Sequence, residues 1–165
     1  MMLQVFKSIP VVHETHRADA LPERARGYVR DTITLGWEER LRSRGRRRSD
    51  GGLEFGTSLP RGTTLRAADC LVVHPRRAVV VVVEREEPVL VVEPRTPAEW
   101  GLFGYYIGNS HQPVMLTDRT MVCPDILGMA QVLEQHRISF VRARCPFTPV
   151  GLLDWYASGH QHLPR

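Results

Sequence analysis

The first half of the chain is dominated by short apolar and alternating segments with the two-residue period of β-strands, and it carries almost no helical periodicity. The segment 78–83 is apolar, β-branched and strand-sized. An Asp50-Gly51 turn joins the arginine-rich segment 40–48 to an apolar return, which predicts a hairpin. We expect strands over residues 3–9, 28–35, 53–56, 70–73 and 78–83, with a polar loop over 13–26. Short strands at this spacing predict a small all-β barrel or sandwich.

The pattern changes near residues 84–88, and helical signals appear. Thr96 is a candidate N-cap, Pro97 suits the first helical position, and Glu99 stands three residues after the cap. A second helix is expected over residues 124–135, where apolar residues recur at helical spacing: Ile126, Met129, Ala130 and Leu133. Strands are expected over residues 89–92, 114–117, 119–123 and 138–142. The resulting order β-α-β-β-α-β is that of a split ferredoxin-like arrangement, so the fold class is α+β.

A single histidine lies just past the first predicted helix. Gly108-Asn109 ends that helix, and Pro113 prevents it from resuming, so His111 is expected on a surface turn. Together with His160 and His162 among the last residues of the sequence, His111 suggests that histidines bind a metal ion. From spacing alone, His111 also fits a helix C-terminal histidine that favours the negative end of the helix dipole, and the other pair fits an ordinary chain end.

Charge and composition narrow the function classes. The 165 residues carry a formal net charge of +4, and the positive residues are almost all arginine. The dense run 40–48 fits either a nucleic-acid patch or the solvated face of a strand pair, but the interleaved aromatic residues that stack on bases are absent. No motif of a hydrolase or a phosphate-binding loop is present, so we expect no enzyme.

The cysteines and the apolar segments indicate the compartment. Three cysteines without a C-x-x-C pair (Cys70, Cys123 and Cys145) are expected to be buried thiols, with Cys123 near the second helix. No apolar stretch reaches the roughly 18 residues of a membrane span, and the start has no signal-peptide pattern. We therefore expect a cytoplasmic protein with no membrane contact.

The order of the motifs resembles the UreE family of urease accessory metallochaperones. In the first half, the resemblance rests on the arginine-rich strand with its Asp50-Gly51 turn, on Leu59-Pro60-Arg61-Gly62, and on Ala68-Asp69-Cys70-Leu71. In the second half, residues 105–111 are similar to the family's Tyr-His-Leu-Gly-Asn-Arg-His segment. Pro146-Phe147-Thr148-Pro149 is similar to its Pro-Phe-x-Pro-Glu segment.

The resemblance implies an organisation and a function. It implies an all-β domain that binds peptides or partners over residues 1–84, a ferredoxin-like metal-binding and dimerisation domain over 85–149, and a flexible metal-binding tail over 150–165. It implies a homodimer in which His111 of both subunits binds one Ni(II), with His160 and His162 as further ligands; Zn(II) or Cu(II) also fits imidazole. It further implies delivery to the GTPase UreG and the UreD/UreF–urease assembly, with no nucleic-acid partner.

Several positions depart from the family pattern. Tyr106 replaces a common histidine, Ser110 replaces the usual arginine, and Val150 stands where glutamate is frequent. Asp125 falls near a region that carries extra histidines in some members. We assign no metal role to the remaining histidines, which are His13, His16, His74 and His136.

Overall fold

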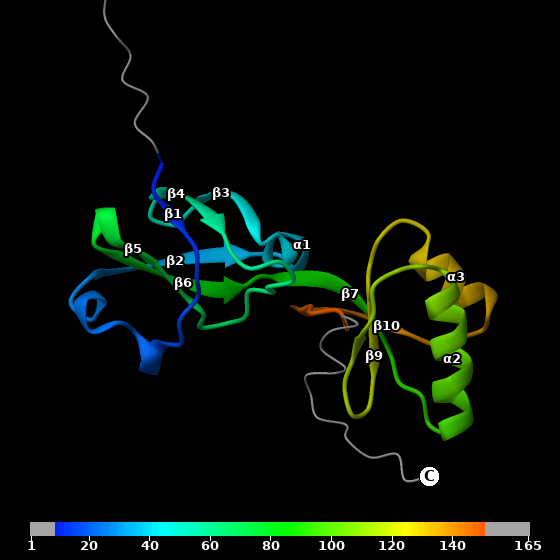
Figure 1. The fold of residues 1–165 in the computed structure, drawn as a ribbon. Coiled ribbons are helices and arrows are strands. Elements are labelled where there is room, and N and C mark those ends of the chain that lie inside the picture. Colours follow the sequence, from blue (N-terminus) through cyan, green and yellow to red (C-terminus); the bar gives the residue numbers. More distant parts are fainter. Residues whose placement is uncertain (1–8, 151–165) are drawn as a thin grey trace, which may run out of the picture. The chain divides into compact units, whose positions relative to one another are not determined.

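The computed structural model describes residues 9–150, which divide into two compact units at Glu84–Arg85. The predicted strand over residues 3–9 therefore lies almost wholly outside the described residues. The first unit contains β1 (Val11–Val12), β2 (Val29–Leu35), α1 (Trp37–Leu41), β3 (Arg44–Arg48), β4 (Glu54–Ser58), β5 (Cys70–Val73) and β6 (Ala78–Glu84). The second contains β7 (Glu86–Val92), α2 (Pro97–Asn109), β8 (Met115–Leu116), β9 (Met121–Pro124), α3 (Met129–Gln135) and β10 (Val141–Pro146) (Figure 1).

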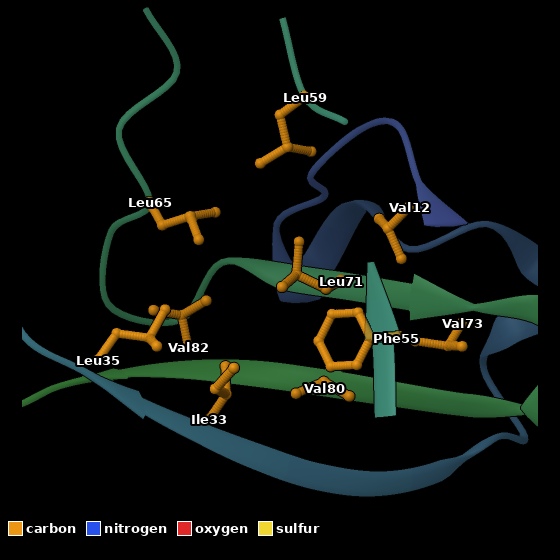
Figure 2. Close-up of a cluster of buried hydrophobic side chains, with 10 residues drawn as sticks. All are labelled: Val12, Ile33, Leu35, Phe55, Leu59, Leu65, Leu71, Val73, Val80 and Val82. Atoms are coloured by element: carbon orange, nitrogen blue, oxygen red, sulfur yellow. The ribbon is translucent and has the colours of Figure 1, made fainter. Parts of the chain in front are cut away.

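Two three-stranded sheets, in the orders β1-β4-β3 and β2-β6-β5, form the first unit. One apolar cluster joins them, with Phe55 from β4 lying among residues of β2, β5 and β6 (Figure 2). Residues Val80 and Val82 of β6 face this cluster, whereas Val79 belongs to a second cluster with Leu21 and Ala25. Both faces of β6 are covered from Ala78 to Val82, which explains why this part of its sequence is continuously apolar rather than alternating, whereas Val83 is exposed.

The arginine-rich hairpin is present but shorter than predicted. Arg44 pairs with Ser58 and Arg48 with Glu54 in an antiparallel register. Arg40 is not part of it, because it lies in the five-residue helix α1. The expectation of a purely β unit is therefore wrong in this detail, and the predicted loop 13–26 also contains two short 3-10 helices.

The hairpin turn is fastened to the free edge of β2. The Asp50 carboxylate accepts hydrogen bonds from the Thr32 hydroxyl at 2.7 Å and from the Thr34 hydroxyl at 2.9 Å. The Asp31 carboxylate in turn accepts hydrogen bonds from the Ser49 hydroxyl at 2.5 Å and from the Gly51 backbone N–H at 3.1 Å. These contacts cover an edge strand with polar groups of the same unit, a common protection against strand-to-strand aggregation.

The second unit has the element order that was predicted, β-α-β-β-α-β. Its sheet order is β10-β7-β9-β8, and every neighbouring pair is antiparallel. Helices α2 and α3 lie on one side of this sheet (Figure 1), and Ile107, Met129 and Leu133 bury their side chains against Leu90 and Val92. Both the second helix and the last strand begin later than expected, at Met129 and Val141.

Candidate metal site

Helix α2 positions the candidate ligand, and its first turn is formed as its sequence predicts. The Thr96 hydroxyl accepts a hydrogen bond from the Glu99 N–H at 3.2 Å, and Pro97 occupies the first helical position. At the other end, the Ser110 hydroxyl donates to the Ile107 carbonyl at 2.6 Å. The Ser110 backbone N–H donates to the same carbonyl at 3.1 Å, so Ser110 caps the last turn through both its backbone and its side chain.

His111 follows in a left-handed conformation, with φ of +54°. Its backbone N–H donates to the Gly108 carbonyl at 3.0 Å. The helix therefore ends at Asn109 as expected, but His111, and not Gly108 or Asn109, takes the left-handed position after it. The side chain is exposed, and within residues 9–150 it makes no hydrogen bond or ion pair. The predicted surface turn is confirmed, and an imidazole on this turn has its ring nitrogens available to a ligand.

The aromatic residues before this turn have structural partners. The Tyr106 ring stacks on His136 with centroids 3.7 Å apart and an interplanar angle of 14°. Tyr106 stands where the family commonly has a histidine, and here the side chain connects α2 to the end of α3. Tyr105 is 63% exposed beside it.

Two other side chains near the second helix do not present donors to a metal. Cys123 is fully buried, and burial raises the pKa of its thiol to about 11, so the thiolate that binds metals is disfavoured. The Asp125 carboxylate accepts from the Arg142 guanidinium at 3.1 Å and is held in an ion pair. These contacts favour histidine over thiolate or carboxylate as the donor in this part of the unit.

Residues 9–150 contain no cluster of three or more histidine, cysteine, aspartate or glutamate side chains arranged around one metal ion. His160 and His162 lie outside the described residues. The described part of one chain thus offers an exposed imidazole at His111 in the second unit, and another at His13 in the first. His74 Nε2 accepts a hydrogen bond from the Arg24 guanidinium at 3.0 Å, and its Nδ1 bonds to the Tyr28 hydroxyl at 3.2 Å. His16 lies 3.4 Å from Glu14.

The arginine run 40–48 is divided between the interior and the surface: two of its six arginines are buried, and the other four are exposed. Arg40 and Arg47 are 1% and 8% exposed, and burial lowers the pKa of Arg47. Arg40 pairs with Glu84 at 3.1 Å, and Arg46 pairs with Glu54 at 3.3 Å on the surface. Arg40 and Arg47 are therefore bound inside the unit and Arg46 is paired at its surface, which removes part of the run from any nucleic-acid contact. Among the described helices, none has the length and apolar character needed to cross a bilayer.

Two arginines that no sequence motif connects lie together in space. Arg95 and Arg137 line a cavity of about 370 Å³ in the second unit. Arg95 precedes α2 and Arg137 follows α3, so no local motif connects them. Only the packing of the two helices on one side of the sheet brings these residues to one end of it.

Comparison with known proteins identifies the family. Residues 9–84 match the family model described as the UreE urease accessory protein, N-terminal domain, and residues 87–164 match its C-terminal domain. The urease accessory protein UreE of Burkholderia vietnamiensis is 32% identical over 131 residues, which cover 79% of this chain and 64% of that protein.

The UreE proteins of Verminephrobacter eiseniae and of a Nostoc species are 32% and 31% identical, and the matches cover 82% and 86% of their lengths. The chain spans 60–64% of the length of several Burkholderia relatives. Both halves of the chain match in the order that the motifs predicted. The chain therefore belongs to the UreE family of urease accessory proteins.

Proposed function

We propose that this protein is a urease accessory metallochaperone, which carries Ni(II) for urease maturation and catalyses no reaction. The observation that supports this most directly is the exposed imidazole of His111 on a structured turn after α2. The matches of both units to UreE domains support the accessory role. We also assign the second unit to the ferredoxin-like arrangement, on the strand order β10-β7-β9-β8.

The metal site that we propose is shared by two copies of the chain. One imidazole binds a divalent ion weakly, whereas a two-fold interface brings the same residue from both protomers to one ion. His111 would then supply two nitrogen donors at the symmetry axis. His160 and His162 would add ligands, because their attachment to the same chain raises their effective concentration near the ion.

A small set of imidazole donors suits a carrier. Ni(II) accepts nitrogen ligands readily, and so do Zn(II) and Cu(II), so histidines alone do not select the metal. Positions on the ion that water fills leave room for an incoming ligand from the recipient. We propose that the recipients are UreG and the UreD/UreF–urease assembly.

Calorimetric titration with Ni(II) tests the site. In His111→Ala, we expect loss of the tightest binding event, while light scattering still shows a dimer. A double substitution of His160 and His162 should weaken binding or remove a looser ion and leave the shared site. If His111→Ala binds Ni(II) like the unmodified chain and the double variant does not, the site belongs to the last residues and the proposal is wrong.

A further inference from the structure

The outer strand of the arginine hairpin is an open edge of its sheet. β3 pairs only with β4 among the described strands, so one side of its backbone has no strand beside it. The register between the two strands is regular, with Arg44 opposite Ser58, Arg48 opposite Glu54 and no extra residue on either strand between these pairs. No bulge therefore interrupts this edge, although bulges are one of the ways in which proteins make an edge unsuitable for pairing.

The register also decides which backbone groups of β3 face the open side. The Ser43 carbonyl accepts from the Leu59 N–H at 2.9 Å, and the Ser49 N–H donates to the Leu53 carbonyl at 2.9 Å. In an antiparallel pair, residues that exchange hydrogen bonds with the partner strand alternate with residues that do not, so the odd-numbered positions are bonded to β4. The even-numbered residues of β3 direct their N–H and C=O groups toward the open side: Arg44, Arg46 and Arg48.

The same three arginines, which we call the arginine edge, place their side chains in solvent. All three are exposed, whereas Arg47 between them is buried. Alternate residues of a strand lie about 6–7 Å apart on one face, so the three guanidinium groups form a row. The residues of β4 opposite them are Ser58, Gly56 and Glu54, and only Glu54 is charged. Three arginines and one glutamate leave an excess of two positive charges on this face of the hairpin.

The charges of the arginine edge have little compensation inside the unit. Arg46 pairs with Glu54 at 3.3 Å, but both side chains are more than half exposed, so water screens this ion pair. Within residues 9–150, the guanidinium groups of Arg44 and Arg48 make no ion pair or hydrogen bond. The Asp50 carboxylate of the hairpin turn is bonded to two hydroxyl groups of β2 instead.

We propose that the arginine edge is a docking site for an extended acidic segment of a partner protein. The segment would add as a strand beside β3 through main-chain hydrogen bonds, with a carboxylate facing each arginine. Opposite charges on facing residues of two strands stabilise their pairing, which selects acidic residues at every second position. Neither contact involves His111, so this proposal does not depend on the metal.

The arrangement of the arginine edge disfavours two other occupants. A second copy of β3 would bring arginine opposite arginine, and like charges directly opposite each other destabilise a strand pair. The phosphate backbone of a nucleic acid would neutralise the guanidinium groups, but it has no N–H donors for the outward carbonyl groups. Only an acidic strand supplies partners for the side chains and for both kinds of backbone group.

A labelled peptide of alternating glutamate and threonine, with one glutamate for each arginine of the edge, is a direct probe. One control peptide has glutamine in place of glutamate, and a second has the same composition with its glutamates adjacent, so that they fall on both faces of a strand. In fluorescence anisotropy with the full chain at physiological ionic strength, we expect the alternating glutamate peptide to bind at least about tenfold more tightly than either control.

Backbone pairing is tested separately by N-methylation of the peptide, which removes N–H donors. Successive N–H groups of a strand point to opposite sides, so only one alternate set of residues can donate to β3. Methyl groups on that set should abolish binding, whereas methyl groups on the other set should change the affinity by no more than about twofold. Hydrogen exchange should show that the unmethylated peptide protects the outward amide of Arg46.

Substitutions locate the site on the chain. Arg44→Gln combined with Arg48→Gln should weaken binding of the glutamate peptide by about tenfold or more, whereas Arg76→Gln, an exposed arginine elsewhere in the first unit, should leave it unchanged. Arg44→Glu combined with Arg48→Glu should reverse the preference, so that a peptide with lysine in place of glutamate binds more tightly than the glutamate peptide. A misfolded variant would not gain this binding.

Several results would overturn the proposal. Equal binding of the alternating glutamate peptide and either control would do so, as would equal effects of the two sets of methyl groups. An equal loss of affinity in the Arg76 variant would indicate general charge attraction. A single-stranded oligonucleotide of the same charge that binds more tightly and displaces the peptide would assign the edge to nucleic acid. Loss of self-association in the Arg44 and Arg48 glutamine variant, measured by light scattering, would make the edge an interface between copies of this chain.

Discussion

The arginine-rich segment of the first unit and the histidine turn of the second unit are the two most conspicuous chemical signals in the sequence, and the structure uses them in opposite ways. Arg40 and Arg47 are buried and bonded inside their unit. His111 is exposed and makes no side-chain bond within residues 9–150. Residue type alone suggests a ligand-binding role for both segments, but burial and bonding partners separate a structural charge from an accessible donor.

The buried arginine shows how the first unit uses charge. The Arg40 guanidinium donates to the Leu65 carbonyl at 3.2 Å and to the Glu84 carboxylate at 3.1 Å. Glu84 also accepts from the Ala67 N–H at 3.0 Å. One ion pair thus connects helix α1, the loop before β5 and the end of β6, and this network explains why a charged residue lies in an apolar environment.

The largest effect that we predict comes from Arg40→Met. The substitution keeps most of the side-chain volume but leaves Glu84 without its cation, and removal of one partner of a buried pair costs about 3–5 kcal/mol. We expect the free energy of unfolding to fall by an amount near the lower end of this range, because the Glu84 side chain is 16% exposed and water can partly solvate it. Urea denaturation measures this loss of stability, and hydrogen exchange shows whether it is the first unit that unfolds more easily.

The matched control for this prediction is Arg44→Met, at an exposed position of the same arginine run. Its free energy of unfolding should change by no more than about 0.5 kcal/mol. Equal losses in the two variants would show that Arg40 is no different from a surface arginine, and the contrast between the two segments would then be wrong.

The second prediction concerns pH and sharpens the contrast at the histidine turn. Only neutral imidazole binds a metal, and ordinary histidine titrates near pH 6.5. If two imidazoles hold the ion, Ni(II) affinity should fall as pH drops from about 7.5 to about 5.5, because protons compete with the metal for the ring nitrogens. Arginine keeps its charge over this range, so the fold of the hairpin should not respond. Calorimetry at both pH values measures the change in Ni(II) affinity. An affinity that does not change with pH would mean that ligands other than histidine bind the ion.

Much of the second unit could be predicted from its sequence, because its signals are local. Thr96, Pro97 and Glu99 mark the start of α2, and Gly108-Asn109 marks its end within one residue. The His111 turn follows from the same pair of residues. Its metal role stays a prediction, since the proposed ligands come from a second chain and from residues beyond 150.

The elements that were misplaced depend on tertiary contacts. Gly128, with φ of +92°, starts α3 later than Pro124, because β9 continues to Pro124 in its pairing with Val89. α1 has five residues, too few for a periodic signal, and is held by Arg40. The cavity at Arg95 and Arg137 depends on how the elements pack, which no pattern along the chain records.

The third prediction tests the polar fastening of the hairpin turn. The Ser49 hydroxyl lowers the pKa of Asp31 more than any other contact; the N–H groups of Thr32 and Gly51 lower it further, and burial opposes them. Ser49→Ala removes this bond and the acceptor for the Leu53 N–H at 2.8 Å, so it should cost about 1 kcal/mol at neutral pH.

The sign of the pH effect follows from the lowered pKa. A carboxyl whose pKa is lower in the folded state stabilises the fold above its ordinary value of 3.8, and that contribution is lost as pH falls through the folded value. The unmodified chain should therefore lose more stability between neutral and strongly acidic pH than Ser49→Ala does. Urea midpoints for both chains measure this difference, and equal losses would show that the Ser49–Asp31 bond is absent in solution.

The smallest effect on stability is expected at His111, and it completes the contrast with Arg40. His111→Asn removes the imidazole but keeps a residue that tolerates the left-handed backbone, whose φ is +54°. Because the side chain is exposed, the free energy of unfolding should change by no more than about 0.5 kcal/mol. Urea denaturation without metal should thus give nearly the same midpoint for both chains, while Ni(II) should stabilise only the unmodified one, since a ligand that binds the folded state raises its stability. A loss of more than about 1 kcal/mol without metal would mean that the imidazole stabilises the fold itself. The histidine turn would then resemble the buried arginines, a structural position rather than a site for a carried ion.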